Sequence, residues 1–113
     1  MEQYRNIKTK EIVAMKEVSI PDSVTSIGGS VFLGCQNLEK VSMSDYVSEV
    51  GTYVFYDCPS LKSVRLSDNL KTIPEYFFCN CSKLTEVNIP SKLETVGKYA
   101  FFSIRIKNTG HII

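Results

Sequence analysis

Residues 18–40, VSIPDSVTSIGGSVFLGCQNLEK, are followed at once by a second version of the same pattern, residues 41–63, VSMSDYVSEVGTYVFYDCPSLKS. Two further rows begin at Val64 and Val87, so the step between rows is 23 residues throughout. A fixed period of about 20 to 50 residues is the sequence signature of a repeat architecture. The apolar residues recur in the same columns of successive rows: Val18, Val41, Val64 and Val87; Ile20, Met43, Leu66 and Ile89; Val24, Val47, Leu70 and Leu93; Ile27, Val50, Ile73 and Val96; Phe32, Phe55, Phe78 and Phe101; Cys35, Cys58 and Cys81; Leu38, Leu61 and Leu84.

Each row contains a stretch with the spacing of a short strand. Leu38, Val41 and Met43 follow an L-x-x-L-x-L spacing, which is typical of the strands that line a repeat solenoid. Alternation along the strand predicts that Val41 and Met43 point inward and that Lys40 and Ser42 point outward. A single row cannot bury its apolar face alone, so the rows must stack. We therefore predict parallel strands side by side on one face, with turns or short 3-10 segments elsewhere.

The rows also resemble a known repeat family. The signature IP-x-x-V-x-x-IG-x-x-AF-x-x-C-x-x-L-x-x-V belongs to the BspA-type, or Treponema-type, leucine-rich repeat, and about 85 residues, from 18 to 101, are similar to it. The resemblance implies an α/β-type repeat solenoid, a short leucine-rich-repeat stack with parallel β-strands on the concave face. It also implies a noncatalytic protein-binding scaffold whose parent protein attaches to host-surface or matrix proteins. Pro74 departs from the glycine of the other rows, and the pattern lapses after Phe102.

The row pattern divides the chain into three segments. Residues 1–17 are interpreted as a degenerate N-terminal cap, with Met15 in the Leu column and Ile12 in the Cys column. Residues 18–102 hold four repeats, which start at residues 18, 41, 64 and 87, and the last is incomplete. Residues 103–113 are predicted to form a closing strand and a short returning tail. If this tail does not fold back, an apolar edge stays exposed, and self-association into a homo-oligomer through the C-terminal edge is expected.

Two further columns indicate turn chemistry. Glycine directly follows the column of Ile27, Val50 and Val96 in three rows, where we expect a positive φ or a tight corner: Gly28, Gly51 and Gly97. Short oxygen-bearing side chains come just after the strands: Asp22, Asp45, Asp68 and Ser91. Such side chains can accept hydrogen bonds from backbone amides and close a turn. A cation held by the three stacked carboxylates is the alternative, although the neighbouring columns add no carboxylates to it.

The cysteines follow the repeat as well. Cys35, Cys58 and Cys81 share an inward column, where buried thiols are the simplest interpretation and a disulfide between column neighbours is the alternative. Cys79 lies two residues before Cys81 in the segment CNC, outside this column. We predict that its side chain points outward and that it is the best candidate for a reactive thiol. The cysteine spacing does not match a zinc site with two CxxC halves.

Composition argues against several classes of function. Thirteen basic and twelve acidic residues give a net charge of +1, which makes nucleic acid a poor candidate partner. The single histidine, His111, is near the C-terminus, and no nucleophile, general base and orienting group are grouped. We therefore predict no enzyme activity and no cofactor.

The N-terminal residues contain no apolar run of the kind found in secretory signals, and no stretch approaches the ~20 apolar residues that span a bilayer. The chain as written is accordingly expected to remain in the cytoplasm and not to insert into membranes. If it is a fragment of a longer family member, the cell surface is expected instead.

Function in such a stack is expected on its surfaces. The outward strand positions are polar and of mixed sign, and they suit a protein or glycan ligand: Lys40, Ser42, Ser63, Arg65, Glu86 and Asn88. A second stripe stands on the turn side: Tyr53, Tyr76 and Tyr99, with Tyr56 and Phe102 in a neighbouring column. Aromatic rows on a rigid scaffold can anchor a partner. The alternative is that these rings only cover the Phe column.

Overall fold

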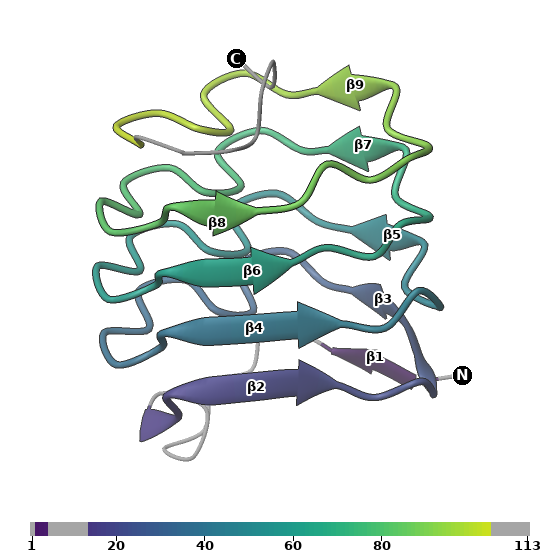
Figure 1. The fold of residues 1–113 in the computed structure, drawn as a ribbon, viewed down its shortest axis with the longest axis horizontal. Helices are drawn as coiled ribbons and strands as arrows, with labels where there is room; N and C mark the ends of the chain where they lie inside the picture. Colours follow the sequence, from purple (N-terminus) through teal and green to yellow (C-terminus); the bar gives the residue numbers. More distant parts are fainter. Residues whose placement is uncertain (1, 5–13, 105–113) are drawn as a thin grey trace.

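The computed structural model describes residues 2–4 and 14–104, and there the chain winds into a stack of similar coils (Figure 1). From residue 15 to residue 104 the chain forms strands and turns without a helix. The described strands are β1 (Glu2–Tyr4), β2 (Glu17–Ile20), β3 (Val24–Ile27), β4 (Lys40–Met43), β5 (Glu49–Val50), β6 (Ser63–Arg65), β7 (Thr72–Ile73), β8 (Glu86–Val87) and β9 (Thr95–Val96). In these ranges the predicted solenoid is confirmed.

The first sheet has the order β2-β4-β6-β8, and its strands are all parallel. Val18 pairs with Val41, Val41 with Val64, and Val64 with Val87, so each residue lies beside the residue 23 positions further on. This register confirms the row pattern. It also places equivalent side chains of successive rows next to one another on both faces of the sheet.

A second set of strands, which the sequence analysis did not predict, lies across the coil from the first sheet (Figure 1). It is split into the groups β1-β3-β5 and β7-β9. Gly51 donates its amide hydrogen to Ile27 O (2.9 Å), and Gly97 donates to Ile73 O (2.7 Å). Pro74 occupies the equivalent position in the third row and has no amide hydrogen to donate. The break between β5 and β7 therefore falls at the row in which proline replaces glycine.

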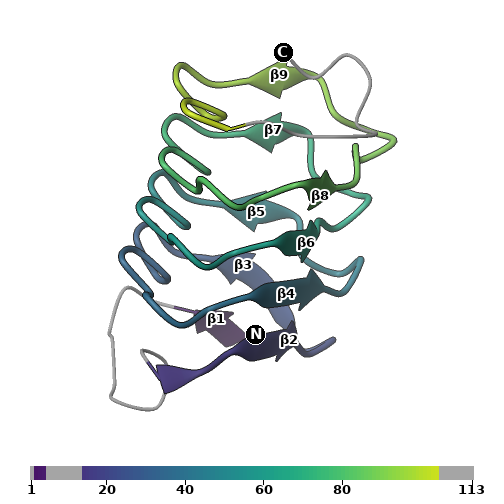
Figure 2. The same cartoon turned by 60° about the vertical axis from the view of Figure 1, so that its left-hand side comes forward.

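The third side of each coil is a chain of turns, which lie directly above one another (Figure 2). Backbone amides of one row donate to carbonyls of the next: Phe55 to Phe77 (2.9 Å), Asp57 to Cys79 (2.9 Å), Phe78 to Ala100 (2.8 Å) and Asn80 to Phe102 (3.0 Å). Neighbouring rows are thus hydrogen-bonded here as well as in the sheets. The turn side is a fixed surface rather than a set of loose loops.

Buried apolar columns fill the interior of the stack. The Phe column is buried in all four rows, and its rings follow one another at centroid separations of 5.3 to 5.5 Å: Phe32, Phe55, Phe78 and Phe101. The Leu column and the Cys column are also buried. Burial ends at the margins of the stack, because Ile89 and Val96 of the fourth row are exposed. Met15, which the row pattern aligns with the Leu column, is exposed too.

The glycine column acts differently from the expectation. None of its members has a positive φ. A Cβ on Gly51 would lie 2.5 Å from the backbone nitrogen of Gly29, and one on Gly97 would collide with the backbone of Pro74 and Glu75. Glycine is needed here because the backbones of adjacent rows approach closely.

The described part of the chain contains no helix that is both long and apolar enough to span a membrane. Residues 5–13 and 105–113 are outside the described ranges. The predictions made for Ile12, for His111 and for all but the first two residues of the closing strand and tail (103–113) therefore lie outside the described residues.

Candidate functional site

The outward positions of the first sheet form one candidate surface. Lys40, Ser63 and Glu86 are neighbours in register across β4, β6 and β8, and Ser42 is beside Arg65. Asn88 follows β8, and its side-chain amide is engaged with the backbone of Leu66: its Oδ1 accepts from the Leu66 amide (2.6 Å) and its Nδ2 donates to Leu66 O (3.0 Å). The structure places five of these residues in strands of one sheet and Asn88 directly after its last strand, and both Arg65 and Asn88 also make hydrogen bonds between rows.

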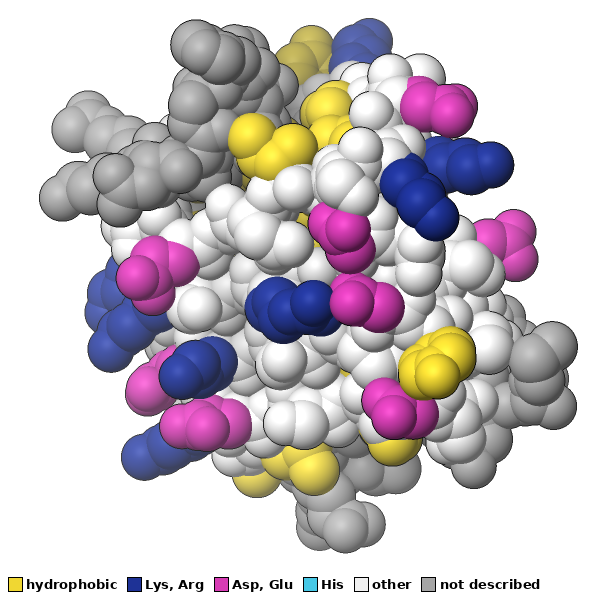
Figure 3. Space-filling model, turned by 45° about the vertical axis from the view of Figure 1, so that its right-hand side comes forward, with side chains coloured by type: hydrophobic (Ala, Val, Ile, Leu, Met, Phe, Trp, Pro, Cys, Tyr) yellow, Lys and Arg dark blue, Asp and Glu magenta, His cyan; other side chains and the backbone are white. Residues whose placement is uncertain are grey.

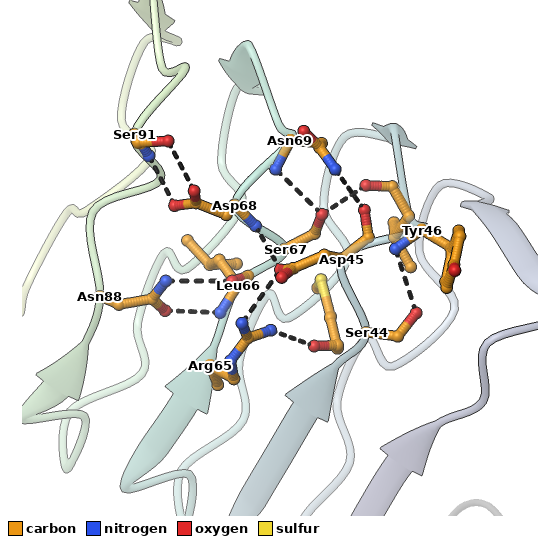
Figure 4. A network of polar contacts seen from close by, with 12 residues as sticks. Ser44, Asp45, Tyr46, Arg65, Leu66, Ser67, Asp68, Asn69, Asn88 and Ser91 are labelled. Atoms are coloured by element: carbon orange, nitrogen blue, oxygen red, sulfur yellow. Dashed lines mark hydrogen bonds and ion pairs between the residues drawn. The ribbon is translucent and has the colours of Figure 1, made fainter.

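A ladder of polar contacts runs along the carboxyl ends of these strands (Figure 4). Asp45 Oδ1 accepts from the backbone amide of Asp68 (2.9 Å), and Asp68 Oδ1 accepts from the amide of Ser91 (2.7 Å). Arg65 donates to Met43 O (2.5 Å) and to Asp45 Oδ1 (3.0 Å). The expected amide capping is present, but it joins adjacent rows instead of closing a turn within one row.

These contacts lower the pKa of both carboxyl groups. For Asp45 the main cause is the hydrogen bond from the Asp68 amide, followed by that from Arg65. For Asp68 the main cause is the hydroxyl of Ser91, followed by the Ser91 amide. Each hydrogen bond favours the ionised form that accepts it. Within the described residues, no three potential metal-binding side chains of His, Cys, Asp or Glu lie together.

An open hollow of about 580 Å³ lies beside this ladder, at the ends of β2 and β4. It is lined by Ser19, Ser42, Asp45, Tyr46 and Arg65, among others. Figure 3 shows acidic and basic side chains interspersed over this side of the molecule, with no extended patch of either sign. The hollow offers hydroxyls, a carboxylate, a guanidinium and an exposed tyrosine ring, which can hydrogen-bond or stack with a polar ligand.

The turn side carries the second candidate surface, here called the aromatic edge: Tyr53, Tyr56, Tyr76, Tyr99 and Phe102. Tyr53 and Tyr76 are stacked, with centroids 4.9 Å apart and planes 6° apart. Tyr76 and Tyr99 are 5.3 Å apart and tilted by 41°. Tyr53 and Tyr76 are half-buried, whereas Tyr99 is 46% exposed and Phe102 is 53% exposed. The inner rings are thus partly shielded by one another, and the outer two rings face solvent.

The tyrosines of this edge occupy an unusual backbone conformation. Tyr53, Tyr76 and Tyr99 have φ values of 61°, 58° and 59°, and Ser30 has the same conformation in the first row. This left-handed region is uncommon for residues other than glycine, asparagine and aspartate, and it is strained for a bulky residue. Strained backbone conformations of this kind persist only where surrounding contacts hold them in place, and here the stacked tyrosine rings supply such contacts.

Cys79 corrects the prediction of an outward, reactive thiol. Its side chain is only 4% exposed, and burial, with a smaller effect of Asp57, raises the pKa of the thiol. No disulfide joins any two of the four cysteines, and Cys58 and Cys81 donate to the carbonyl oxygens of Phe32 and Phe55. A protonated, buried thiol is a poor nucleophile.

The position of Cys79 creates a hollow that sequence reasoning missed. The same column contains Leu33, Tyr56 and Phe102, so a small side chain stands between two large rings. A hollow of about 260 Å³ results, lined by Tyr56, Tyr76, Cys79, Asn80, Tyr99 and Phe102. The signal was present in the sequence as the one small residue of an otherwise bulky column.

The fold and these surfaces define a leucine-rich-repeat solenoid without a recognisable catalytic centre in its described part. Residues 10–111 match the family described as BspA type leucine rich repeat region, in six copies. The chain belongs to the BspA-type leucine-rich repeat family. Such repeat proteins are typically noncatalytic scaffolds with a role in protein interaction.

Two solved structures illustrate the likeness. The leucine-rich repeat protein of T. pallidum is 27% identical with a TM-score of 0.78, and the match covers 91% of this chain and 48% of that one. A leucine-rich repeat protein from Bacteroides ovatus is 39% identical with a TM-score of 0.70, and the match covers 78% of this chain and 22% of that one. This chain thus spans less than half of either protein. A search of curated proteins finds no match.

Proposed function

We propose that this chain is a noncatalytic scaffold that binds another protein through its aromatic edge. The observation that carries the proposal is the pair of solvent-facing rings, Tyr99 and Phe102, at the end of a stacked aromatic row. Their centroids are 5.6 Å apart and their planes meet at 85°. Aromatic side chains supply a large contact area with few rotatable bonds, so fixing them in a complex costs little entropy.

The backbone beneath these rings supports this role. Asn80 donates to Phe102 O (3.0 Å) and Tyr76 donates to Lys98 O (3.1 Å), so the fourth row is joined to the third on both sides of Tyr99. A surface that is already ordered loses less conformational entropy on binding than a mobile loop. For the identity of the partner, we propose the host-surface or matrix proteins that the family resemblance implies, with a surface glycan as the alternative ligand.

Binding to arrays of purified matrix proteins, cell-surface proteins and glycans tests the proposal. The double variant Tyr99→Ser/Phe102→Ser is expected to lose most of the bound signal and to retain its thermal transition. Tyr46→Ser, which removes an exposed ring from the opposite edge, is the matched control and should bind as the parent does. Binding that survives the double variant but fails with Lys40→Ala or Glu86→Ala would place the contact on the first sheet and refute the aromatic edge.

A second candidate function is self-association through the fourth row. Ile89 is 45% exposed and lies two residues after β8, and Val96 is also exposed and belongs to β9. These two strands are the outermost described strands of their sheets. An apolar side chain beside an unpaired strand favours pairing with another copy. Light scattering over a concentration series should then show growth that Ile89→Lys abolishes. A parent chain that stays monomeric at every concentration would rule out this function.

A further inference from the structure

The hollow of the aromatic edge has the dimensions of a site for one side chain. Its volume of about 260 Å³ equals that of roughly nine water molecules at about 30 Å³ each. Cys79 lines it between Tyr56 and Phe102, and its small side chain leaves open the space that a larger residue of the same column would fill. Its walls are rings set at steep angles: Tyr56 and Tyr76 meet at 65°, and Tyr99 and Phe102 meet at 85°.

The electrostatics of the hollow favour a cation. Ring faces carry negative charge density from the π electrons, and the six lining residues include no basic side chain. The Asp57 carboxylate acts on two of the lining residues, since it raises the pKa of both Tyr56 and Cys79. Burial is the main cause of the raised pKa of Tyr76, and Glu75 contributes only weakly to it. Asp57 is not itself a lining residue, but it follows Tyr56 in the chain and its backbone amide donates to Cys79 O (2.9 Å), so its negative charge lies next to two of the lining residues.

We propose that this hollow binds the guanidinium group of an arginine side chain presented by the protein partner. Guanidinium is planar and weakly hydrated, so it can stack on a ring while it pairs with a carboxylate, and it suits this site better than a strongly hydrated ammonium. Asn80 adds an amide oxygen and Tyr56 a hydroxyl oxygen that can accept its N–H groups. This inference rests on the proposed binding role of the aromatic edge and names the chemistry that the edge recognises.

The structure contains a parallel for such a contact. Lys98 Nζ lies 5.2 Å from the centroid of the Tyr99 ring, so a ring of this edge is already in cation–π contact. The lysine is also a positive charge close to the hollow, and it should weaken the binding of a second cation. Replacing Lys98 by Gln is therefore expected to strengthen arginine binding a few-fold.

Titration of the full chain with N-acetyl-arginine amide, followed by the ring proton signals in NMR spectra, tests the proposal. We expect saturable, millimolar binding that shifts the signals of Tyr56, Tyr76, Tyr99 and Phe102. The neutral isostere N-acetyl-citrulline amide should bind roughly tenfold more weakly, because a desolvated cation–π contact and a carboxylate partner are lost. N-acetyl-leucine amide tests whether the hollow instead takes an apolar side chain.

Variants at Cys79 and Asp57 sharpen the test. Cys79→Phe places a ring in the hollow and should abolish binding, whereas Cys79→Ser leaves the space open and should retain it. Asp57→Asn, which tolerates the left-handed backbone at this position (φ 58°), should weaken arginine binding several-fold and leave citrulline binding unchanged. Asp57 is exposed, so Asp57→Asn does not alter packing in the interior. It therefore tests the binding of arginine even if Cys79→Phe fails to fold.

Each remaining outcome separates this inference from the proposed function. Leucine amide binding as tightly as arginine amide, or arginine shifts confined to residues outside the edge, would overturn the inference. If arginine amide does not bind while partner capture still depends on Tyr99 and Phe102, the proposed function stands and the inference fails. If arginine amide binds as expected while partner capture is indifferent to Tyr99, the inference stands and the proposed function fails.

Discussion

Phe55 packs against three other buried aromatic rings, one of which lies outside its own column. It stacks on Phe32 (5.4 Å) and Phe78 (5.5 Å) from the rows on either side, and it meets Phe77 edge to face (5.3 Å). Truncating this side chain would lower the stability of the fold for two reasons: the hydrophobic contribution of the buried ring is lost, and a cavity is left in its place. The stability of the stack thus depends on contacts between rows at single residues.

Phe55→Ala is expected to lower the free energy of unfolding by about 3 to 5 kcal/mol. Phe102→Ala removes the same ring from an exposed position of the fourth row and should cost only about 1 kcal/mol, mainly from its contact with Tyr99. Denaturant unfolding followed by circular dichroism measures both. Equal losses for the two variants would contradict the central role of the Phe column.

At the residue scale, sequence reasoning succeeded for columns and failed for single exceptions. The repeat predicted the buried Phe, Leu and Cys columns because each position has the same surroundings in successive rows. Cys79 was predicted to point outward, but it is buried in a turn in which Tyr76 and Asn80 have positive φ values, so its orientation cannot be read from the neighbouring Cys column. Its hollow depends on Tyr56 and Phe102, which are 23 residues away on either side.

At the scale of elements, the first sheet followed from the L-x-x-L-x-L spacing, whereas the second set of strands did not. β5, β7 and β9 are only two residues long, too short for an alternation to be recognised. The split between β5 and β7 was not predicted. Pro74 was recognised as a departure from the repeat, but the sequence did not show that the glycine amides of this column donate hydrogen bonds to the preceding row. The polar ladder was predicted in part. The side chains that accept hydrogen bonds from backbone amides were identified correctly, but only the register of the rows in the structure shows that these amides belong to the next row.

This ladder makes the link between rows sensitive to acid. Because the folded pKa of Asp45 and Asp68 is lower than the unfolded value near 3.8, their contribution to stability is present above that value. It is lost as the pH falls below about 3.8 through the folded pKa, when protonation removes the acceptors. Asp68→Asn should therefore reduce the fall in melting temperature between neutral and strongly acidic solution.

Thermal melts of parent and variant over this range measure the effect. Asp22→Asn removes one carboxylate from the first row of the same column and is the matched control, for which the fall should stay close to that of the parent. A parent and an Asp68→Asn variant that lose the same melting temperature on acidification would show that the carboxylate has no part in holding the third row to the fourth.

At the scale of the whole molecule, every described row contributes to the same three kinds of contact: the first-sheet ladder, the buried columns and the hydrogen bonds between turns. No row is stable by contacts within itself, so the free energy of the stack is approximately a sum over interfaces between neighbours. Side chains that differ between rows leave the first sheet and the buried columns intact: Cys79 changes a local surface, and Pro74 interrupts only the second set of strands. This separation of scaffold and surface allows a repeat protein to acquire a specific ligand without losing its fold.

Duplication of residues 41–63 tests this additivity. The inserted row keeps the 23-residue register, places Phe55 over Phe55 and Leu61 over Leu61, and sets glycine against glycine at position 51, where a Cβ could not fit. It adds one complete interface, so the free energy of unfolding and its dependence on denaturant should both rise, the latter because more surface is exposed on unfolding. Duplication of residues 41–52 alone adds similar chemistry but shifts all later columns out of register, and this variant should unfold at lower denaturant than the parent. A full-row insertion that leaves the denaturant dependence unchanged would mean that the extra row loops out, and that the stack does not grow by simple addition.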